Sequence, residues 1–187
     1  MVEPEHIYQQ SLARLKTRQE FLQGEVLVDT EIWTQKQGRT LLLIMVGKIA
    51  AAYSFTRTQV LNFNNYPPLF DFVRECLDDR DHGVLTVKAS LFLHRFSSTI
   101  DYVIEDNLLT FSVREGTLKG CSGLVELEDC FTPETIISIS GQINRKRFPV
   151  PDVLIHWGAQ WILAKGARNF KEHVESAWQE MSENLGK

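Results

Sequence analysis

The stretch that decides the fold of this chain reads IAAAYSFTRTQVLNFNNYP and runs from residue 49 to residue 67. Small residues end an apolar strand at its start, and Ser54 is a suitable N-cap for a short helix that reaches about Phe63. A second short helix follows, with Asn65 as its cap and a Pro-Pro pair in its first turn, where amide donors are unpaired in any case. These two helices predict a single interruption in a series of strands.

Two strand-like runs precede this stretch, at residues 25–33 and 40–50. The first alternates with a period of two, as a strand with one buried face does. The second is apolar on both faces, which indicates that other elements cover both of its sides. Before them, a loose apolar stripe predicts a helix over residues 5–22 that ends at Gly24.

Period-two alternation returns after the short helices and predicts about six further strands. Short turns, such as those at residues 79–83 and 105–107, separate them, so neighbouring strands are expected to be antiparallel. In the last third of the chain, apolar residues recur at three- and four-residue spacing and predict a long helix over residues 152–184. That helix is large enough to cover the apolar face of a bent sheet.

The fold class that follows is α+β. We expect a curved antiparallel sheet of about seven to eight strands, wrapped on the long C-terminal helix, with two short helices after the second strand. Residues 23–187 are predicted to form this one domain, and residues 1–22 to add an N-terminal helix. A chain of 187 residues can bury a sizeable core and still enclose a pocket.

Three stretches carry a resemblance to a known superfamily: residues 49–67, the Gly-Leu-Val-Glu-Leu run at residues 123–127, and the Pro-Val-Pro at residues 149–151 before the last helix. In this order they resemble the polyketide cyclase/dehydrase and START-like lipid-binding superfamily, in particular a bacterial branch of it. Its helix-grip fold is shared with the major birch pollen allergen. The resemblance covers the chain from about Gly24 onward and implies a ligand cavity between the sheet and the long helix.

Composition and charge argue against several classes of function. The net charge of −4 lacks the basic footprint of generic nucleic-acid binding. The five histidines are scattered without ligand spacing, so we expect no metal and no cofactor. If Met1 is the native start, its acidic surroundings predict a cytoplasmic location; an exported or periplasmic location is the alternative if a leader precedes it, as in some members of that branch.

Motifs for catalysis are absent from the sequence, which has no G-x-S-x-G, no H-E-x-x-H and no phosphate-binding loop. Cys76 and Cys121 can supply a thiol, but nothing local marks a base, so structural cysteines are favoured. Gly116, Gly120 and Gly123 fit bends or close approaches in a curved sheet better than a phosphate cradle. We therefore assign no catalytic residue and expect the chain to bind a hydrophobic small molecule: a lipid, a quinone or a polyketide-like compound.

Aromatic residues are the candidates for lining the cavity that the resemblance implies. Trp157 and Trp161 lie one turn apart in the first half of the long helix. The short helices offer Phe63, Tyr66 and Phe70 for the mouth of the cavity. The remaining candidates come from the strands: Tyr102 and Phe111.

Two other functions stay open. An aromatase/cyclase-type enzyme would use Tyr102, Asp101 or Arg114, and it needs an ionisable group with a displaced pKa inside the cavity. A protein- or RNA-interaction module of the ribosome-associating kind would use a basic patch before the long helix, which also suits a membrane surface. The residues of that patch are Arg145, Lys146 and Arg147.

Overall fold

The computed structural model describes residues 4–35, 38–91, 94–144 and 152–185, and its elements follow the predicted order. The helices are α1 (Pro4–Lys16), α2 (Gln19–Leu22), α3 (Tyr53–Val60), the 3-10 turn η1 (Phe63–Asn65), α4 (Tyr66–Leu69) and α5 (Asp152–Leu185). The strands are β1 (Leu27–Gln35), β2 (Gly38–Ile49), β3 (Val73–Asp79), β4 (Val84–Leu91), β5 (His94–Ile104), β6 (Leu108–Gly116), β7 (Ser122–Asp129) and β8 (Thr135–Asn144).

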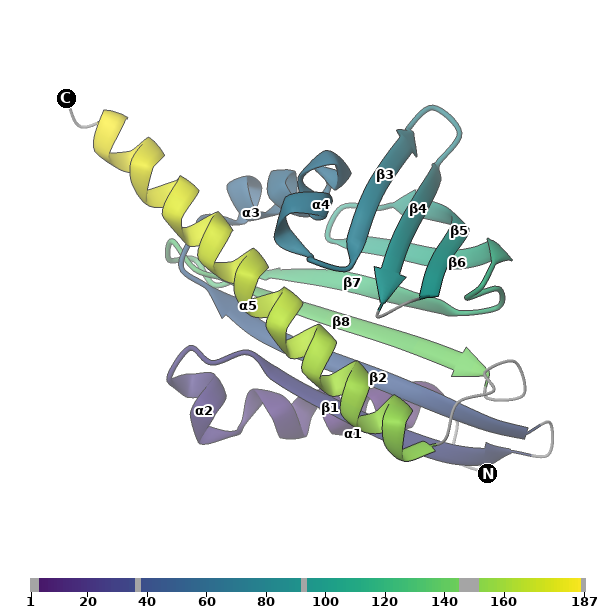
Figure 1. Cartoon of the computed structure of the whole chain (residues 1–187). Helices are drawn as coiled ribbons and strands as arrows, with labels where there is room; N and C mark the ends of the chain where they lie inside the picture. The colour runs from purple at the N-terminus through teal and green to yellow at the C-terminus, as the bar shows by residue number, and fades with distance from the viewer. Residues whose placement is uncertain (1–3, 36–37, 92–93, 145–151, 186–187) are drawn as a thin grey trace.

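Within the described residues, one antiparallel sheet of eight strands has the order β1-β2-β8-β7-β6-β5-β4-β3. Strand β8 pairs with β2, and β3 forms the edge of the sheet opposite β1. The short helices between β2 and β3 therefore connect the β1 side of the sheet to its opposite edge. Figure 1 shows α5 lying diagonally across one face of this sheet, with α3 and α4 beside it. This is the helix-grip arrangement, and the predicted fold class is confirmed.

Strand β2 is buried on both faces, as its apolar sequence predicts. On one face, Leu42 and Ile44 pack in a core with residues of α1 and α2, among them Leu12 and Leu15. On the other face, Met45 packs with Ala167 of α5. The N-terminal helices therefore cover the face of the sheet that α5 leaves open (Figure 1).

The N-terminal helix differs from its prediction, because it is two helices instead of one. The chain leaves α1 after Lys16 and re-enters a helix at Gln19. At the break, the Thr17 hydroxyl donates to the carbonyls of Ala13 and Arg14, at 3.2 and 3.0 Å. A side chain that bonds back to the preceding turn competes with continuation of the helix. The turn lets α2 pack Phe21 into the same core as α1.

The start of α3 also corrects a prediction. The helix begins at Tyr53, with Ala52 in the N-cap position and no side-chain cap, whereas we expected Ser54 to be the cap. The hydroxyl of the buried Thr135 instead donates to the carbonyl of Ala51, at 2.9 Å. A bond from β8 therefore holds the backbone that leads into α3, so the position does not depend on a capping serine.

No helix among the described residues combines the length and apolar character needed to cross a membrane.

Candidate functional site

A cavity of about 280 Å³ lies between the sheet, the short helices and α5. This is close to the lower end of the range of small-molecule sites, about 300–1,000 Å³. Aliphatic side chains of the strands form its floor: Met45, Ile49, Leu85, Ile100, Leu109, Val125, Ile137 and Ile139. Aromatic and aliphatic residues of the helices and of the β3, β5 and β6 region close it: Val60, Phe63, Tyr66, Phe70, Phe72, Tyr102, Phe111, Ile162, Leu163, Ala167 and Phe170.

Among the described lining residues, polar side-chain groups come only from two tyrosines and one lysine, and each is already bonded within the protein. Tyr66 donates its hydroxyl to the carbonyl of Val60 at 2.7 Å. Lys171 donates to the carbonyl of Lys48 at 2.8 Å and forms an ion pair with Glu175. The wall therefore presents apolar surface to an occupant.

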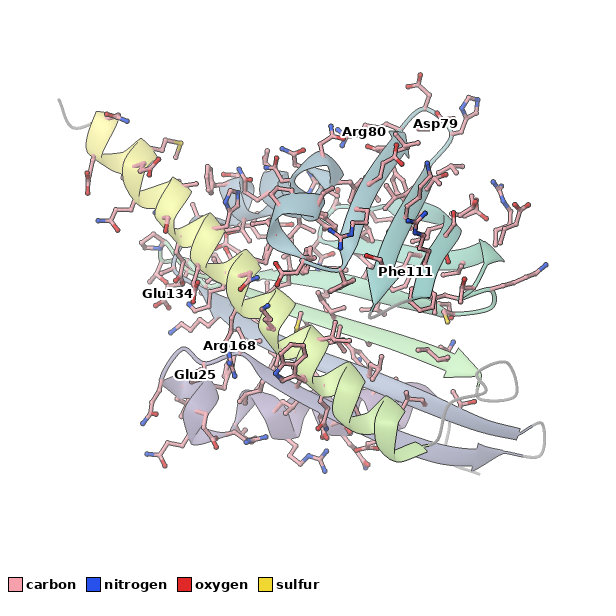
Figure 2. The ribbon with its side chains drawn as sticks, viewed as in Figure 1. Glu25, Asp79, Arg80, Phe111, Glu134 and Arg168 are labelled. Carbon is pink, nitrogen blue, oxygen red and sulfur yellow. The ribbon has the colours of Figure 1, made fainter. Side chains whose placement is uncertain are left out.

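Tyr102 lines the cavity, and its hydroxyl belongs to a small network of polar contacts. It donates to Asp78 Oδ1 at 2.6 Å, and Asp78 Oδ2 lies 3.3 Å from the guanidinium of Arg80. Arg80 in turn donates to the carbonyl of Leu61 at 2.8 Å. This chain of bonds ties β5 and β3 to the turn after α3; Figure 2 labels Arg80 at that end of the molecule.

Tyr102 leads to a prediction about stability at high pH. Burial, together with the bond to Asp78, raises the pKa of Tyr102 to about 12 from its ordinary value of 10.0. The folded protein holds this proton more tightly, so the stabilisation is complete below about pH 10 and is lost as the pH rises through about 12. We expect the urea-unfolding free energy of the wild type to fall over that window, and that of Tyr102→Phe to fall less steeply. Parallel curves for the two proteins would contradict this role.

The aromatic candidates from the short helices and strands come together in the structure. Phe63, Tyr66, Phe70, Tyr102 and Phe111 all line the cavity. Tyr66 lies at the centre of an aromatic group, with its ring centroid 5.5 Å from Phe63 and 5.3 Å from Phe70. Phe111, labelled in Figure 2, reaches the cavity from β6.

Trp161 is not a lining residue of the cavity, which corrects its prediction. Its side chain is 67% exposed, and it lies in a shallow groove beside the cavity. The face of α5 toward the cavity carries Ile162, Leu163 and Ala167 instead. The side chain of Trp157 and the basic patch Arg145, Lys146 and Arg147 lie outside the described residues.

The residues considered for an enzyme are divided between two faces of the sheet. Tyr102 faces the cavity, but its neighbour Asp101 points to the opposite face, as alternation along a strand requires. There Asp101 forms an ion pair with Arg114 at 3.1 Å, with both side chains well exposed. Asp101 and Arg114 are therefore not available to a molecule in the cavity.

Sequence reasoning missed the aliphatic lining residues, although the signal for those on α5 was present. The amphipathic stripe of the last helix includes Leu163, Ala167 and Phe170, and all three line the cavity, together with Ile162 and Lys171. The stripe indicated the cavity-facing side of α5 more reliably than Trp161 did.

Cys76 is not activated as a nucleophile. Burial, with smaller contributions from Asp78 and Glu75, raises the pKa of Cys76 to about 11, so it is a thiol at neutral pH. The described residues also contain no cluster of three or more histidine, cysteine or acidic side chains that would hold a metal ion.

No family model matches the sequence, and no curated protein matches it. Solved structures do match the fold. A START superfamily protein from Mycobacterium smegmatis has a TM-score of 0.63 at 14% identity, covering 73% of this chain and 98% of its own. The ZhuI aromatase/cyclase from Streptomyces sp. R1128 has a TM-score of 0.55 at 11% identity, covering 75% and 94%. The major latex-like protein 151 from Panax ginseng has a TM-score of 0.54 at 17% identity, covering 72% and 97%. These likenesses show that the chain has a START-like helix-grip fold.

Proposed function

We propose that this protein binds a hydrophobic small molecule in the cavity and holds it without transforming it, as a carrier or sensor does. The observation that carries the proposal is an apolar cavity in which the described polar side chains are already paired within the protein. Such a site gains binding energy from apolar area, at about 25 cal/mol per Å² buried. A ligand that buries about 300 Å² would gain about 7.5 kcal/mol before the costs of association.

The same pairing favours binding over acid–base chemistry. Proton transfer requires a group that is free to reach the ligand and that titrates near neutral pH. The hydroxyls of Tyr66 and Tyr102 are donated to protein acceptors, and burial raises the pKa of both. Of the structures with the same fold, one is described as a START superfamily protein and one as an aromatase/cyclase. The paired hydroxyls support binding without a reaction for this chain, with a lipid, a quinone or a polyketide-like molecule as the ligand class.

Titration with a neutral apolar fluorescent dye, Nile red, tests this proposal. We expect a saturable rise in emission that corresponds to one dye per chain, and we expect dodecanol to displace the dye. A signal that never saturates, or that dodecanol leaves unchanged, would count against a defined apolar site.

A further inference from the structure

A second space, of about 170 Å³, lies beside the cavity between α5 and the segment that joins α4 to β3. We call it the groove. Phe70, Phe72 and Ile162 line both the groove and the cavity, so one layer of side chains separates the two spaces. The other side chains of the groove include polar residues and one tryptophan: Asp71, Ser90, Trp161, Lys165 and Asn169.

Phe70 is the main part of the separating layer. Its ring lies against the backbone of α5 at Gly166, where an added Cβ would be 2.6 Å from the ring atoms Cδ1 and Cε1. The rings of Tyr66 and Phe72 flank it, with centroids 5.3 and 5.9 Å away. Phe70 is half-buried, and a change of its side-chain rotamer would move its ring out of the layer that separates the groove from the cavity.

The described lining of the groove carries one cation, Lys165, and one carboxylate, Asp71, and a second cation, Arg74, lies beside it. Lys165 forms an ion pair with Asp71, and its ammonium lies 5.7 Å from the centroid of the Trp161 ring. Arg74 reaches the same place from β3, where its Nε donates to Ser90 Oγ at 2.7 Å. The hydrogen bond from Lys165, and more weakly the charge of Arg74, lower the pKa of Asp71, so its carboxylate is charged at neutral pH. With Arg74 counted as a neighbour of the groove, two cations lie near one carboxylate.

The ion pair in the groove is open to exchange. The side chains of Lys165 and Asp71 are 47% and 68% exposed. Exposed pairs of this kind contribute little to stability, so an incoming anion can replace Asp71 as the partner of Lys165. Trp161, which is also exposed, offers an apolar ring next to that charge, and such amphipathic surfaces suit the boundary between a polar and an apolar part of a ligand.

We propose that the groove binds the anionic head of an amphipathic ligand, a carboxylate or a phosphate, whose apolar tail occupies the cavity. This inference rests on the proposed function of the cavity. Lys165 supplies the charge for the head, Trp161 packs beside the atoms that join head to tail, and Phe70 lies where the ligand crosses from the groove to the cavity. The polar side chains among the described cavity residues are paired within the protein, and the Lys171–Glu175 pair is less exposed than the Lys165–Asp71 pair, so the groove is the more accessible place for the polar end of a ligand.

Calorimetric titration at low ionic strength, with three ligands that share one tail, tests the proposal. These are dodecanoate, dodecyl phosphate and neutral dodecanol. We expect both anions to bind the wild-type chain about fivefold more tightly than the alcohol, because charge-assisted hydrogen bonds to the head add to the same burial of the tail. This preference should weaken as salt is added.

Two substitutions in the groove have opposite expected effects. Lys165→Gln should remove the preference for the anions and leave the affinity for dodecanol unchanged. Asp71→Asn should raise the affinity for the anions, because it removes the competing carboxylate. Arg168→Gln is the matched control, since Arg168 lies almost one turn further along α5, is exposed and does not line the groove (Figure 2). If the Lys165–Asp71 ion pair had only a structural role, Lys165→Gln and Asp71→Asn would change the affinity for the anions in the same direction.

The outcomes separate this proposal from the function of the cavity. If none of the three ligands binds, the proposed function fails. If all three bind equally and Lys165→Gln changes nothing, the groove is not a head site, while the function of the cavity stands. If inorganic phosphate alone binds as tightly as dodecyl phosphate, the groove is independent of the cavity and the proposal is overturned.

Discussion

Replacing Ala167 by phenylalanine is expected to abolish high-affinity binding in the cavity while the protein stays folded. Ala167 is buried on the face of α5 that lines the cavity, so a larger side chain there extends into the empty space. Excluding a ligand from about 100 Å² of apolar wall costs it about 2.5 kcal/mol, or about 70-fold in affinity. Filling an apolar cavity also recovers dispersion contacts, so we expect no large loss of stability.

The measurement is a Nile red titration alongside thermal unfolding. Glu172→Phe, at an exposed position of the same helix, is the matched control and should bind as the wild type does. A folded Ala167→Phe protein that still binds the dye with wild-type affinity would place the binding site elsewhere.

Replacing Gly123 by alanine is expected to destabilise the whole domain. In the sheet, Gly123 lies between Phe111 of β6 and Gly141 of β8. A Cβ at Gly123 would be 2.1 Å from the carbonyl oxygen of Ser140 and 2.6 Å from Cζ of Phe111. Backbone cannot move aside as a flexible side chain does, so we expect a cost of about 3 kcal/mol and a melting temperature lower by about 6–12 °C.

Gly141 provides the control for that change. It pairs directly with Gly123, but a Cβ there would meet only the carbonyl oxygen of Ser122, at 3.9 Å. Gly141→Ala should therefore leave the melting temperature within a few degrees of the wild type, since alanine also lowers the entropy of the unfolded chain. Equal effects of the two substitutions would show that close packing at Gly123 is not the cause.

The fold was predictable because its signals are local and agree with one another. The period-two runs gave the strands, and the stretch over residues 49–67 placed the short helices between β2 and β3. The doubly apolar β2 correctly indicated cover on both faces, which α1 and α5 provide. The break at Thr17 was not predictable, because it depends on a hydroxyl bonding to the preceding turn, which the stripe of apolar residues does not record.

The site was only partly predictable. The aromatic residues of η1 and α4 reach the cavity, as do Phe70, Tyr102 and Phe111, so five of the seven aromatic candidates line it. Trp161 was predicted to line the cavity because it is aromatic and lies one turn from Trp157 in the first half of the long helix. It precedes Leu163 by two residues, which is about 200° around an α-helix, and this turns it away from the cavity.

The hydrogen-bond acceptors of the cavity tyrosines could not be predicted from the sequence. Tyr66 and Val60 are close in the sequence, but Tyr102 meets Asp78 only because β5, β4 and β3 are neighbours in the sheet. Whether a buried hydroxyl is free or already bonded depends on this register. Because both hydroxyls are already bonded within the protein, we favour ligand binding over catalysis.

Native mass spectrometry of the protein purified from cells, followed by organic extraction, shows whether the cavity holds a ligand. We expect a reproducible mass excess of one small molecule per chain, recovered as an apolar or amphipathic compound and lost in Ala167→Phe. A protein that is empty as purified, and that takes up nothing from a lipid extract, would contradict it.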